Sequence, residues 1–132
     1  MVEKPTIGFI GVGFMGHGMA SNILKNGYPL MIKGNRNRTP IDDLIKKGAM
    51  EADSLATLMK SSEIIHLCLS NSLQVENVLE GPGGIIENAR AGVIIIDTST
   101  SDPESSVRMS EALKKVGMEF VDAPLGLSLI HI

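Results

Sequence analysis

The sequence predicts an α/β fold in which a doubly wound parallel sheet carries helices on both faces. Short apolar runs alternate with helical patterns along the chain. Those runs are continuously apolar, as expected of strands that are buried on both faces of a parallel sheet. Right-handed crossovers between such strands give an open sheet, whose ligands bind beyond the carboxyl ends of the strands.

Five apolar runs are the predicted strands, and each is bounded by turn residues or by a helical pattern. In chain order they are TIGFI (6–10), PLMIK (29–33), IIHLCLS (64–70), VIIID (93–97) and MEFVDA (118–123).

The segments between these runs have helical periodicity. In chain order they are FMGHGMASNILKNG (14–27), PIDDLIKKGA (40–49), SLATLMKSS (54–62), SLQVENVLEG (72–81) and SDPESSVRMSEALKKVG (101–117). The first places Met15, Met19 and Ile23 on one face and ends at Gly27. The second and third follow each other with no strand predicted between them. The last begins with Ser101 and Glu104 at capping-box spacing.

Composition is that of an ordinary soluble domain with one core. The chain has 132 residues, of which 43% are hydrophobic and 20% charged. A net charge of −3 and only 3% aromatic residues argue against a nucleic-acid partner. Cys68 is the single cysteine, and neither a signal-peptide pattern nor a membrane-spanning run is present. We therefore expect a cytoplasmic protein that does not bind membranes.

The motif GVGFMG fits the G-x-G-x-x-G pattern between a strand and a helix. Gly11 permits the tight turn, Gly13 lets the backbone approach a pyrophosphate, and Gly16 lets the helix pack closely on the strand. Free N–H groups and the helix dipole at this point attract phosphate. The predicted cofactor contacts here are Gly11, Val12, Gly13, Phe14, Met15 and Gly16. A tight turn without a ligand is the alternative.

The end of the second predicted strand favours NADP over NAD. An NAD enzyme usually has a carboxylate there to hold the ribose hydroxyls. No Asp or Glu occurs between Glu3 and Asp42, whereas Asn35, Arg36 and Arg38 follow the strand. These basic and amide side chains suit the 2′-phosphate of NADP, and we rank Arg36 above Arg38. A solvated basic loop is the alternative, and NAD remains possible.

Several other polar residues have structural interpretations. His17 is expected to be an exposed helical histidine, although it could reach a phosphate. His66 is expected to be a hydrogen-bonded interior residue, and Cys68 to pack in the core. Asp97 is expected to order the DTST turn rather than to act as a general base, and Asp122 has the same ambiguity. No metal-ligand spacing is present, so we predict no metal site.

Five segments together resemble the β-hydroxyacid dehydrogenase family. They are IGFIGVGFMGHGMASNILKNGY, GNRNRTPIDDLIKKGA, LCLSNSLQVENVLEGPGGI, GVIIIDTSTSDPESS and GMEFVDAPLG. That family includes 3-hydroxyisobutyrate dehydrogenase and tartronate semialdehyde reductase and is related to 6-phosphogluconate dehydrogenase. The resemblance covers Thr6 to about Gly126 and implies a Rossmann domain over residues 1–126.

The resemblance implies further site residues. Leu69 and Ser70 match a Leu-Pro pair beside the adenosine and nicotinamide ribose, Gln74 lies near another cofactor contact, and Thr100 matches a hydroxyl residue beside the nicotinamide. The family text D-A-P-V-S-G-G holds the substrate carboxylate, so Leu125 and Gly126 become weak substrate candidates. Ser70 and the Gly34-Asn35 pair depart from the common pattern, and the latter leaves the choice of cofactor open.

In the family a second, helical domain supplies a catalytic lysine, which would lie beyond residue 132. We therefore expect the 132-residue chain to be inactive alone. The parent enzyme would take a small anionic hydroxy acid or semialdehyde and form a homo-oligomer through that domain.

The tail LSLIHI (127–132) is interpreted as non-native. It is the translation of CTG TCT CTT ATA CAC ATC, a transposon end used as a sequencing adapter.

The sequence thus predicts the cofactor-binding portion of an NAD(P)-dependent oxidoreductase that interconverts a β-hydroxy acid and its oxo form. Two alternatives stay open at this point: a nucleotide-binding sensor module without redox chemistry, and an enzyme of the imine reductase type. The identity of the catalytic residues stays unknown.

Overall fold

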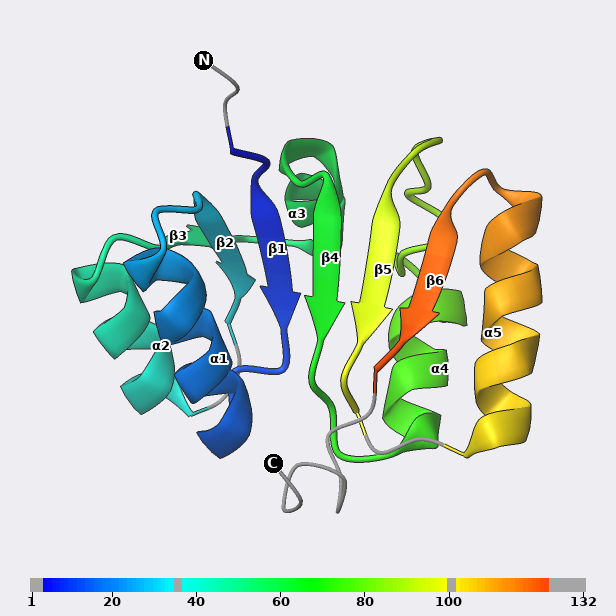
Figure 1. Ribbon diagram of the computed structural model, residues 1–132, viewed down its shortest axis with the longest axis horizontal. Helices are drawn as coiled ribbons and strands as arrows, with labels where there is room; N and C mark the ends of the chain where they lie inside the picture. Colours follow the sequence, from blue (N-terminus) through cyan, green and yellow to red (C-terminus); the bar gives the residue numbers. More distant parts are fainter. Residues whose placement is uncertain (1–3, 35–36, 100–101, 124–132) are drawn as a thin grey trace.

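The computed structural model describes residues 4–34, 37–99 and 102–123. Figure 1 shows a single sheet with its helices. The elements in chain order are β1 (Ile7–Ile10), α1 (Phe14–Lys25), β2 (Leu30–Lys33), α2 (Arg38–Lys46), β3 (Met50–Ala52), α3 (Leu55–Ser61), β4 (Ile64–Leu67), α4 (Ser72–Glu80), β5 (Ile94–Asp97), α5 (Pro103–Lys115) and β6 (Glu119–Asp122).

The strands of the described residues form one parallel sheet in the order β3-β2-β1-β4-β5-β6. β1 is central, and its Phe9 lies opposite Ile32 of β2 and opposite His66 of β4. The strand order reverses between β1 and β4, which is where ligands bind in open α/β sheets. The doubly wound class predicted from the sequence is confirmed.

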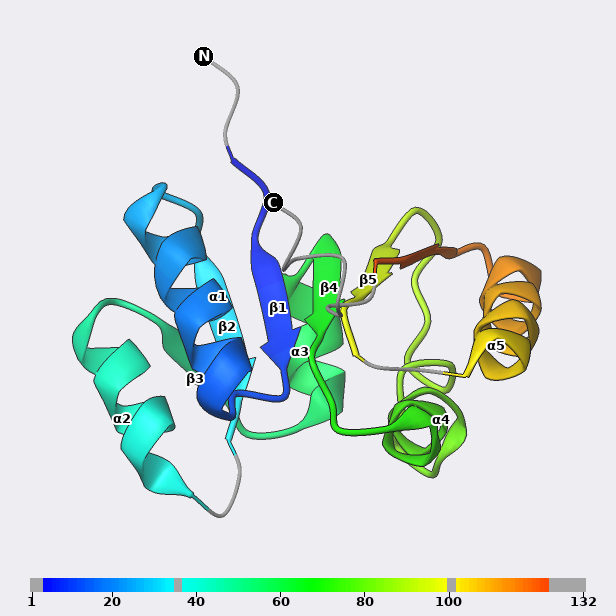
Figure 2. The same cartoon turned by 60° about the horizontal axis from the view of Figure 1, so that its bottom comes forward.

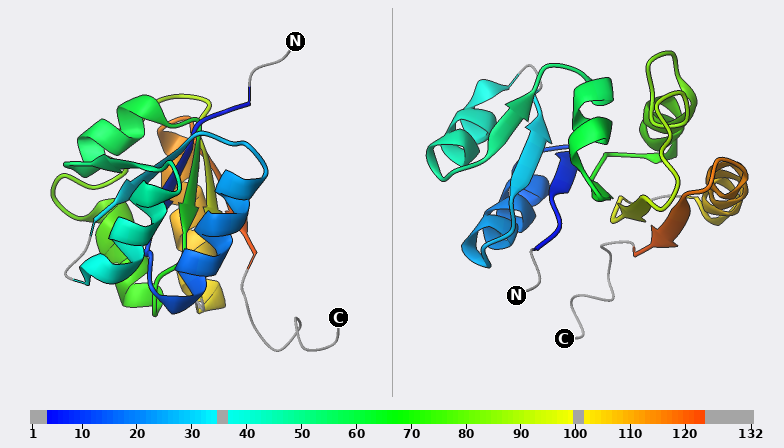
Figure 3. Two further views of the ribbon diagram at one scale, coloured as in Figure 1. Left: turned by 90° about the vertical axis from the view of Figure 1, so that its left-hand side faces the viewer. Right: turned by 90° about the horizontal axis from the view of Figure 1, so that it is seen from above.

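Helices cover both faces of the sheet, and the left view of Figure 3 shows α1 and the helices α3 and α4 on opposite sides of the strands. On one face α1 and α2 enclose a core that includes Phe9, Ile32 and Leu44. On the other face α3, α4 and α5 pack on a second core that includes Ile65 and Leu79. Successive strand residues point to opposite faces, so β1, β2 and β4 contribute side chains to both cores, whereas β5 and β6 contribute to the second core.

The structure contains a strand that the sequence pattern does not predict. β3 lies between α2 and α3, where two consecutive helices were expected, and pairs with β2 through Met31 and Met50. Its three residues, MEA, offer only Ala52 to the core, since Met50 and Glu51 are exposed. Such a segment lacks the apolar run that marks the other strands.

Three local expectations are also corrected. Helix α5 begins with Asp102 as its N-cap and Pro103 as its first residue, so the capping position is not Ser101. β4 ends at Leu67, and the predicted remainder of that strand, 68–70, forms a loop. Met15 is 53% exposed although it shares the periodicity of Met19, because it lies in the first turn of α1 beyond the end of the sheet.

No helix in the described parts of the chain is long and apolar enough to cross a membrane.

Ile65 gives a direct test of the core. It is fully buried in the central strand β4. We expect Ile65→Ala to lower the free energy of unfolding by about 2–5 kcal/mol, because it removes apolar contacts and leaves a cavity. Urea unfolding measures this change. Val107→Ala, at an α5 position that is 60% exposed, should stay within about 0.5 kcal/mol of the wild type. Equal effects of the two substitutions would contradict the described core.

Candidate functional site

The carboxyl ends of the parallel strands meet at one edge of the sheet, at the bottom of Figure 1 and toward the viewer in Figure 2. The turns after β1, β2, β4 and β5 all lie there. The end of β6 belongs to the same edge, since the Ala123 N–H donates to the Asp97 carbonyl oxygen at 2.8 Å. Residues far apart in sequence are therefore neighbours at this edge.

The glycine turn after β1 depends on close backbone contacts. Gly11 has φ of +101°, and a Cβ on it would lie 2.1 Å from the Cys68 carbonyl oxygen. A Cβ on Gly16 would lie 2.1 Å from the Gly11 carbonyl oxygen and 3.1 Å from the ring of Phe9. Both positions therefore require glycine, as the sequence predicts for the turn and for close helix–strand packing.

Gly13 differs from its two neighbours in the motif. It is exposed, and a Cβ on it would meet nothing within 4 Å. Its backbone is extended, with φ of −93°, so its conformation does not require glycine. Open space beside this backbone is what a closely approaching group needs, and the fold itself does not use that space.

Helix α1 begins without the side-chain cap that three other helices have. Asn37, Ser54 and Asn71 cap α2, α3 and α4 by accepting hydrogen bonds from backbone N–H groups. Gly13, the N-cap of α1, has no such side chain, and the first turn of α1 contains no acidic residue. The N–H groups of a helix start carry partial positive charge, so this end of α1 favours an anion.

The loop after β4 is held by short-range hydrogen bonds. The Ser70 N–H donates to Gln74 Oε1 at 2.8 Å, and the Gln74 N–H donates to Asn71 Oδ1 at 2.9 Å. The Leu69 N–H donates to Ser99 Oγ at 2.7 Å, which ties the loop to the end of β5. Leu69 is half-buried and Ser70 is exposed, so Leu69 and Ser70 lie at the edge as predicted.

The end of β5 carries a buried polar group. Asp97 is fully buried, and its Oδ1 accepts the Ser99 N–H at 2.8 Å, so Asp97 orders the turn as expected. The Thr98 hydroxyl donates to the Leu67 carbonyl oxygen at 2.8 Å. That bond uses the only hydroxyl proton, so the contact of 3.1 Å from Thr98 Oγ1 to His66 Nε2 needs a proton on Nε2.

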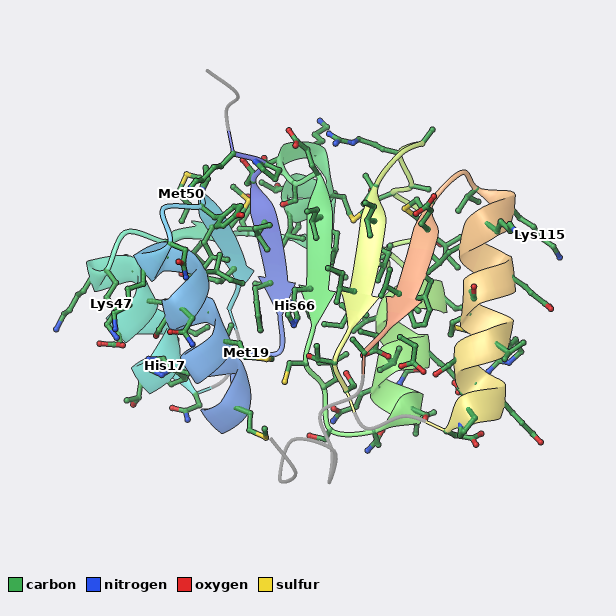
Figure 4. The ribbon with its side chains drawn as sticks, in the orientation of Figure 1. His17, Met19, Lys47, Met50, His66 and Lys115 are labelled. Atoms are coloured by element: carbon green, nitrogen blue, oxygen red, sulfur yellow. The ribbon has the colours of Figure 1, made fainter. Side chains whose placement is uncertain are left out.

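His66 and Cys68 make packing contacts within the domain. The His66 ring stacks on Phe9 with centroids 4.6 Å apart, and burial lowers its pKa, while the Asp97 charge opposes this shift. Burial raises the pKa of the Cys68 thiol. Figure 4 shows His66 on β4 within the sheet. Both residues therefore favour their neutral forms, as expected of interior side chains.

The end of β2 carries an ion-pair cluster. Arg38 donates to both carboxylate oxygens of Glu51, at 2.6 and 2.9 Å, and to Asp42 Oδ1 at 3.2 Å. The hydrogen bond with Arg38 lowers the pKa of the Glu51 carboxyl and raises the pKa of Arg38. An open pocket of about 440 Å³ adjoins this cluster and is lined by Lys33, Gly34, Arg38, Glu51, Ala52 and Asp53.

His17 was expected to be an exposed helical histidine, but it is only partly exposed and pairs with a carboxylate. Its Nε2 lies 2.6 Å from Asp43 Oδ2, which joins α1 to α2, and Lys47 reaches the same carboxylate at 2.9 Å. These contacts lower the pKa of Asp43, with the hydrogen bond from His17 as the largest cause. His17 and Lys47 are labelled in Figure 4. A hollow of about 940 Å³ lies beside this pair and extends to Gly13.

Five of the predicted site residues lie outside the described residues: Asn35, Arg36, Thr100, Leu125 and Gly126. The tail 127–132 and the capping candidate Ser101 also lie outside them. For Phe14 only its backbone, in the first turn of α1, is described.

Two residues of this edge, Glu51 and Asn71, were not predicted from the sequence. Asn71 has a recognisable signal, because Asn before an apolar-periodic segment is a typical helix cap. Glu51 has none, since its place depends on the unpredicted strand β3. No group of three His, Cys, Asp or Glu side chains suited to a metal ion occurs in the described part of the chain.

Comparisons with known proteins agree with this geometry. A family model described as the NAD binding domain of 6-phosphogluconate dehydrogenase matches residues 6–126. The chain is 38% identical over 122 residues to the uncharacterised oxidoreductase YkwC of Bacillus subtilis, covering 92% of this chain and 42% of YkwC. It is 34% identical over 129 residues to the mitochondrial 3-hydroxyisobutyrate dehydrogenase of Mus musculus, covering 95% of this chain and 37% of that protein.

A solved structure of Psf3 in complex with NADP+ and 2-OPP has a TM-score of 0.81 and 30% sequence identity. The match covers 86% of this chain and 40% of Psf3. The chain therefore spans 37–42% of the length of these relatives.

The glycine contacts lead to a paired prediction. We expect Gly16→Ala to lower the free energy of unfolding by about 1–3 kcal/mol, because the new methyl group would overlap a backbone oxygen that cannot easily move. Gly18→Ala, in the same helix but with nothing within 4 Å of its Cβ, should raise it by roughly 0.5–1 kcal/mol through helix propensity. Urea unfolding compares them, and a stabilising Gly16→Ala would refute the described turn.

His66 should make stability depend on pH. Burial holds its folded pKa below 6.5, so on acidification the unfolded chain takes up the proton first. The free energy of unfolding should therefore fall as the pH drops through 6.5 and level off below the folded pKa. His66→Gln should flatten this slope, whatever its effect on stability at neutral pH. Urea unfolding between about pH 4 and 8 measures the slope, and an unchanged slope in the variant would show that His66 is not its source.

Proposed function

The chain belongs to the family described as the NAD binding domain of 6-phosphogluconate dehydrogenase, and on that premise we propose that it binds NADP, with NAD as the weaker ligand. The proposed parent enzyme is an oxidoreductase that interconverts a small β-hydroxy acid and its oxo or semialdehyde form. The observation that carries the proposal is the turn 11–16, where an uncapped helix start meets open space at Gly13.

The residues of this edge fit a dinucleotide. Gly11 and Gly16 are required by the fold, whereas a Cβ on Gly13 would meet nothing within 4 Å, which leaves room for a ligand at the start of α1. The N–H groups of the α1 start can donate to a pyrophosphate there. A bound nicotinamide dinucleotide would supply the hydride acceptor or donor that this chain's own side chains lack.

Further contacts are assigned by position. Leu69 and Ser70 lie on the loop after β4, Gln74 lies in the first turn of α4, and all three would line the cofactor beside the topological switch point. The hydrogen bond from the Ser70 N–H to Gln74 Oε1 ties that loop to the start of α4. Thr100 would lie near the nicotinamide, and Leu125 and Gly126 near the substrate, as the family resemblance implies.

The preference for NADP rests on charge. No acidic residue occurs between Glu3 and Asp42, and Arg36 and Arg38 follow β2 in the sequence. Charge-assisted hydrogen bonds from such guanidinium groups suit a phosphate dianion. The solved complex of the similar Psf3 contains NADP+, which supports the same choice.

The relatives support redox chemistry on a hydroxy acid over the two alternatives. One similar protein is named an oxidoreductase and another 3-hydroxyisobutyrate dehydrogenase, names that favour neither a nucleotide sensor nor an imine reductase. A small anionic substrate, a homo-oligomeric parent and a cytoplasmic location belong to the same proposal.

Cofactor titration into the chain tests the proposal. We expect NADPH to bind about ten- to hundredfold more tightly than NADH, as measured by nicotinamide fluorescence or calorimetry. Gly13→Ala should weaken both cofactors by roughly tenfold or more, because its methyl group occupies the space for the pyrophosphate. Its free energy of unfolding should stay near that of the wild type.

Gly18→Ala serves as the control for that substitution, because Gly18 is exposed in the same helix and its Cβ would also contact nothing. It should leave both affinities unchanged. Equal binding of NADH and NADPH would refute the NADP preference. Full affinity in Gly13→Ala would refute the role of the turn.

A further inference from the structure

A carboxylate from the neighbouring strand β3 lies at the end of β2, although β2 and the loop that follows it contain no acidic residue. Glu51 occupies the middle of β3, opposite Ile32 of β2. Its side chain reaches the residue that follows β2, since a Cβ on Gly34 would lie 2.0 Å from Glu51 Oε2. The absence of a side chain at Gly34 is what leaves room for the carboxylate.

This carboxylate holds Arg38 in a two-pronged ion pair. Nη1 of Arg38 lies 2.6 Å from Oε2, and Nη2 lies 2.9 Å from Oε1. The side chains are 48% exposed for Arg38 and 30% exposed for Glu51. Parallel N–H···O bonds of this kind are the strong, geometrically defined form of the pair. Arg38 is therefore already engaged at the place where a 2′-phosphate would need it.

The two forms of the cofactor meet this pair differently. A 2′-phosphate carries up to two negative charges near neutral pH, so it must compete with Glu51 for the guanidinium and is repelled by the carboxylate. A ribose 2′-hydroxyl can instead donate a hydrogen bond to a carboxylate at this position. Glu51 thus opposes NADP and tolerates NAD.

We propose that Glu51 is a specificity-determining residue, which limits the preference for NADP by competing with the 2′-phosphate for Arg38. This inference rests on the proposed function, because it concerns the adenosine end of the same cofactor site. The preference between NADP and NAD then depends on the balance between Arg38 and Glu51, and not on the basic residues alone.

The test is titration of NADPH and NADH into the 132-residue chain and its Glu51→Gln variant. Gln keeps the size of the side chain and removes its charge. The affinity for NADPH should rise by about tenfold, while that for NADH stays equal or falls. In the double variant with Arg38→Ala the gain should disappear, because the released guanidinium is its source.

Two matched controls separate this effect from a general change in charge. Glu63→Gln removes the same charge just before β4, at the opposite edge of the sheet, and should change neither affinity. Asp42→Asn removes the longer contact to Arg38, at 3.2 Å, and should have a smaller effect than Glu51→Gln. If urea unfolding shows that Glu51→Gln is not folded, Glu51→Ala is the second variant.

The outcomes distinguish the two proposals. If the wild type binds both cofactors and Glu51→Gln leaves their ratio unchanged, the role of Glu51 is refuted while the proposed function stands. A weaker affinity of Glu51→Gln for NADPH also refutes it, since Glu51 would then only position Arg38. If the wild type binds neither cofactor, the proposed function fails, and the inference fails with it.

Discussion

The contact between backbone atoms in the turn after β1 is the constraint on which the rest of the site depends. The Gly11 carbonyl oxygen occupies the place where a Cβ of Gly16 would lie, and the Cys68 carbonyl oxygen does the same for Gly11. Backbone atoms of two packed elements cannot move aside as the end of a flexible side chain can. The start of α1 is therefore fixed over the end of β1, and both are fixed against the end of β4. The glycine turn and the pairing of β1 with β4 therefore depend on each other.

Parts of the structure that depend on local sequence could be predicted, whereas parts that depend on contacts between distant segments could not. Strands β1, β2, β4 and β5 were predictable because each contains an apolar run, β6 because Phe120 and Val121 follow a helix that ends at a glycine, and the glycine turn because its requirements are local. β3 was not, since its residues Met50 and Glu51 are exposed and its pairing comes from β2. The position of Glu51 beside Gly34 depends on that pairing. The contact between His17 and Asp43 depends likewise on how α1 packs on α2, which periodicity does not report.

The charges at the cofactor edge are distributed unevenly between its two ends. At the start of α1 the backbone alone provides a favourable environment for an anion, without a nearby acidic residue in the first turn. At the end of β2 the guanidinium of Arg38 donates hydrogen bonds to both Glu51 and Asp42. The first end can hold the pyrophosphate that NAD and NADP have in common. In the proposed function the second end discriminates between them, with groups that neutralise each other in the free protein.

The strand order also determines what the chain exposes while it is being synthesised. β1, β2 and β3 emerge from the ribosome first, yet β1 lies between β2 and β4. Until Cys68 has emerged, one edge of β1 lacks its complete partner strand and Gly11 lacks the carbonyl group against which it packs. An unpaired strand edge is a template for pairing with other chains, and long-range parallel pairing is slow to form. A translational pause between β3 and β4 would prolong that exposure, and chaperone contact during this interval would protect the nascent domain from aggregation.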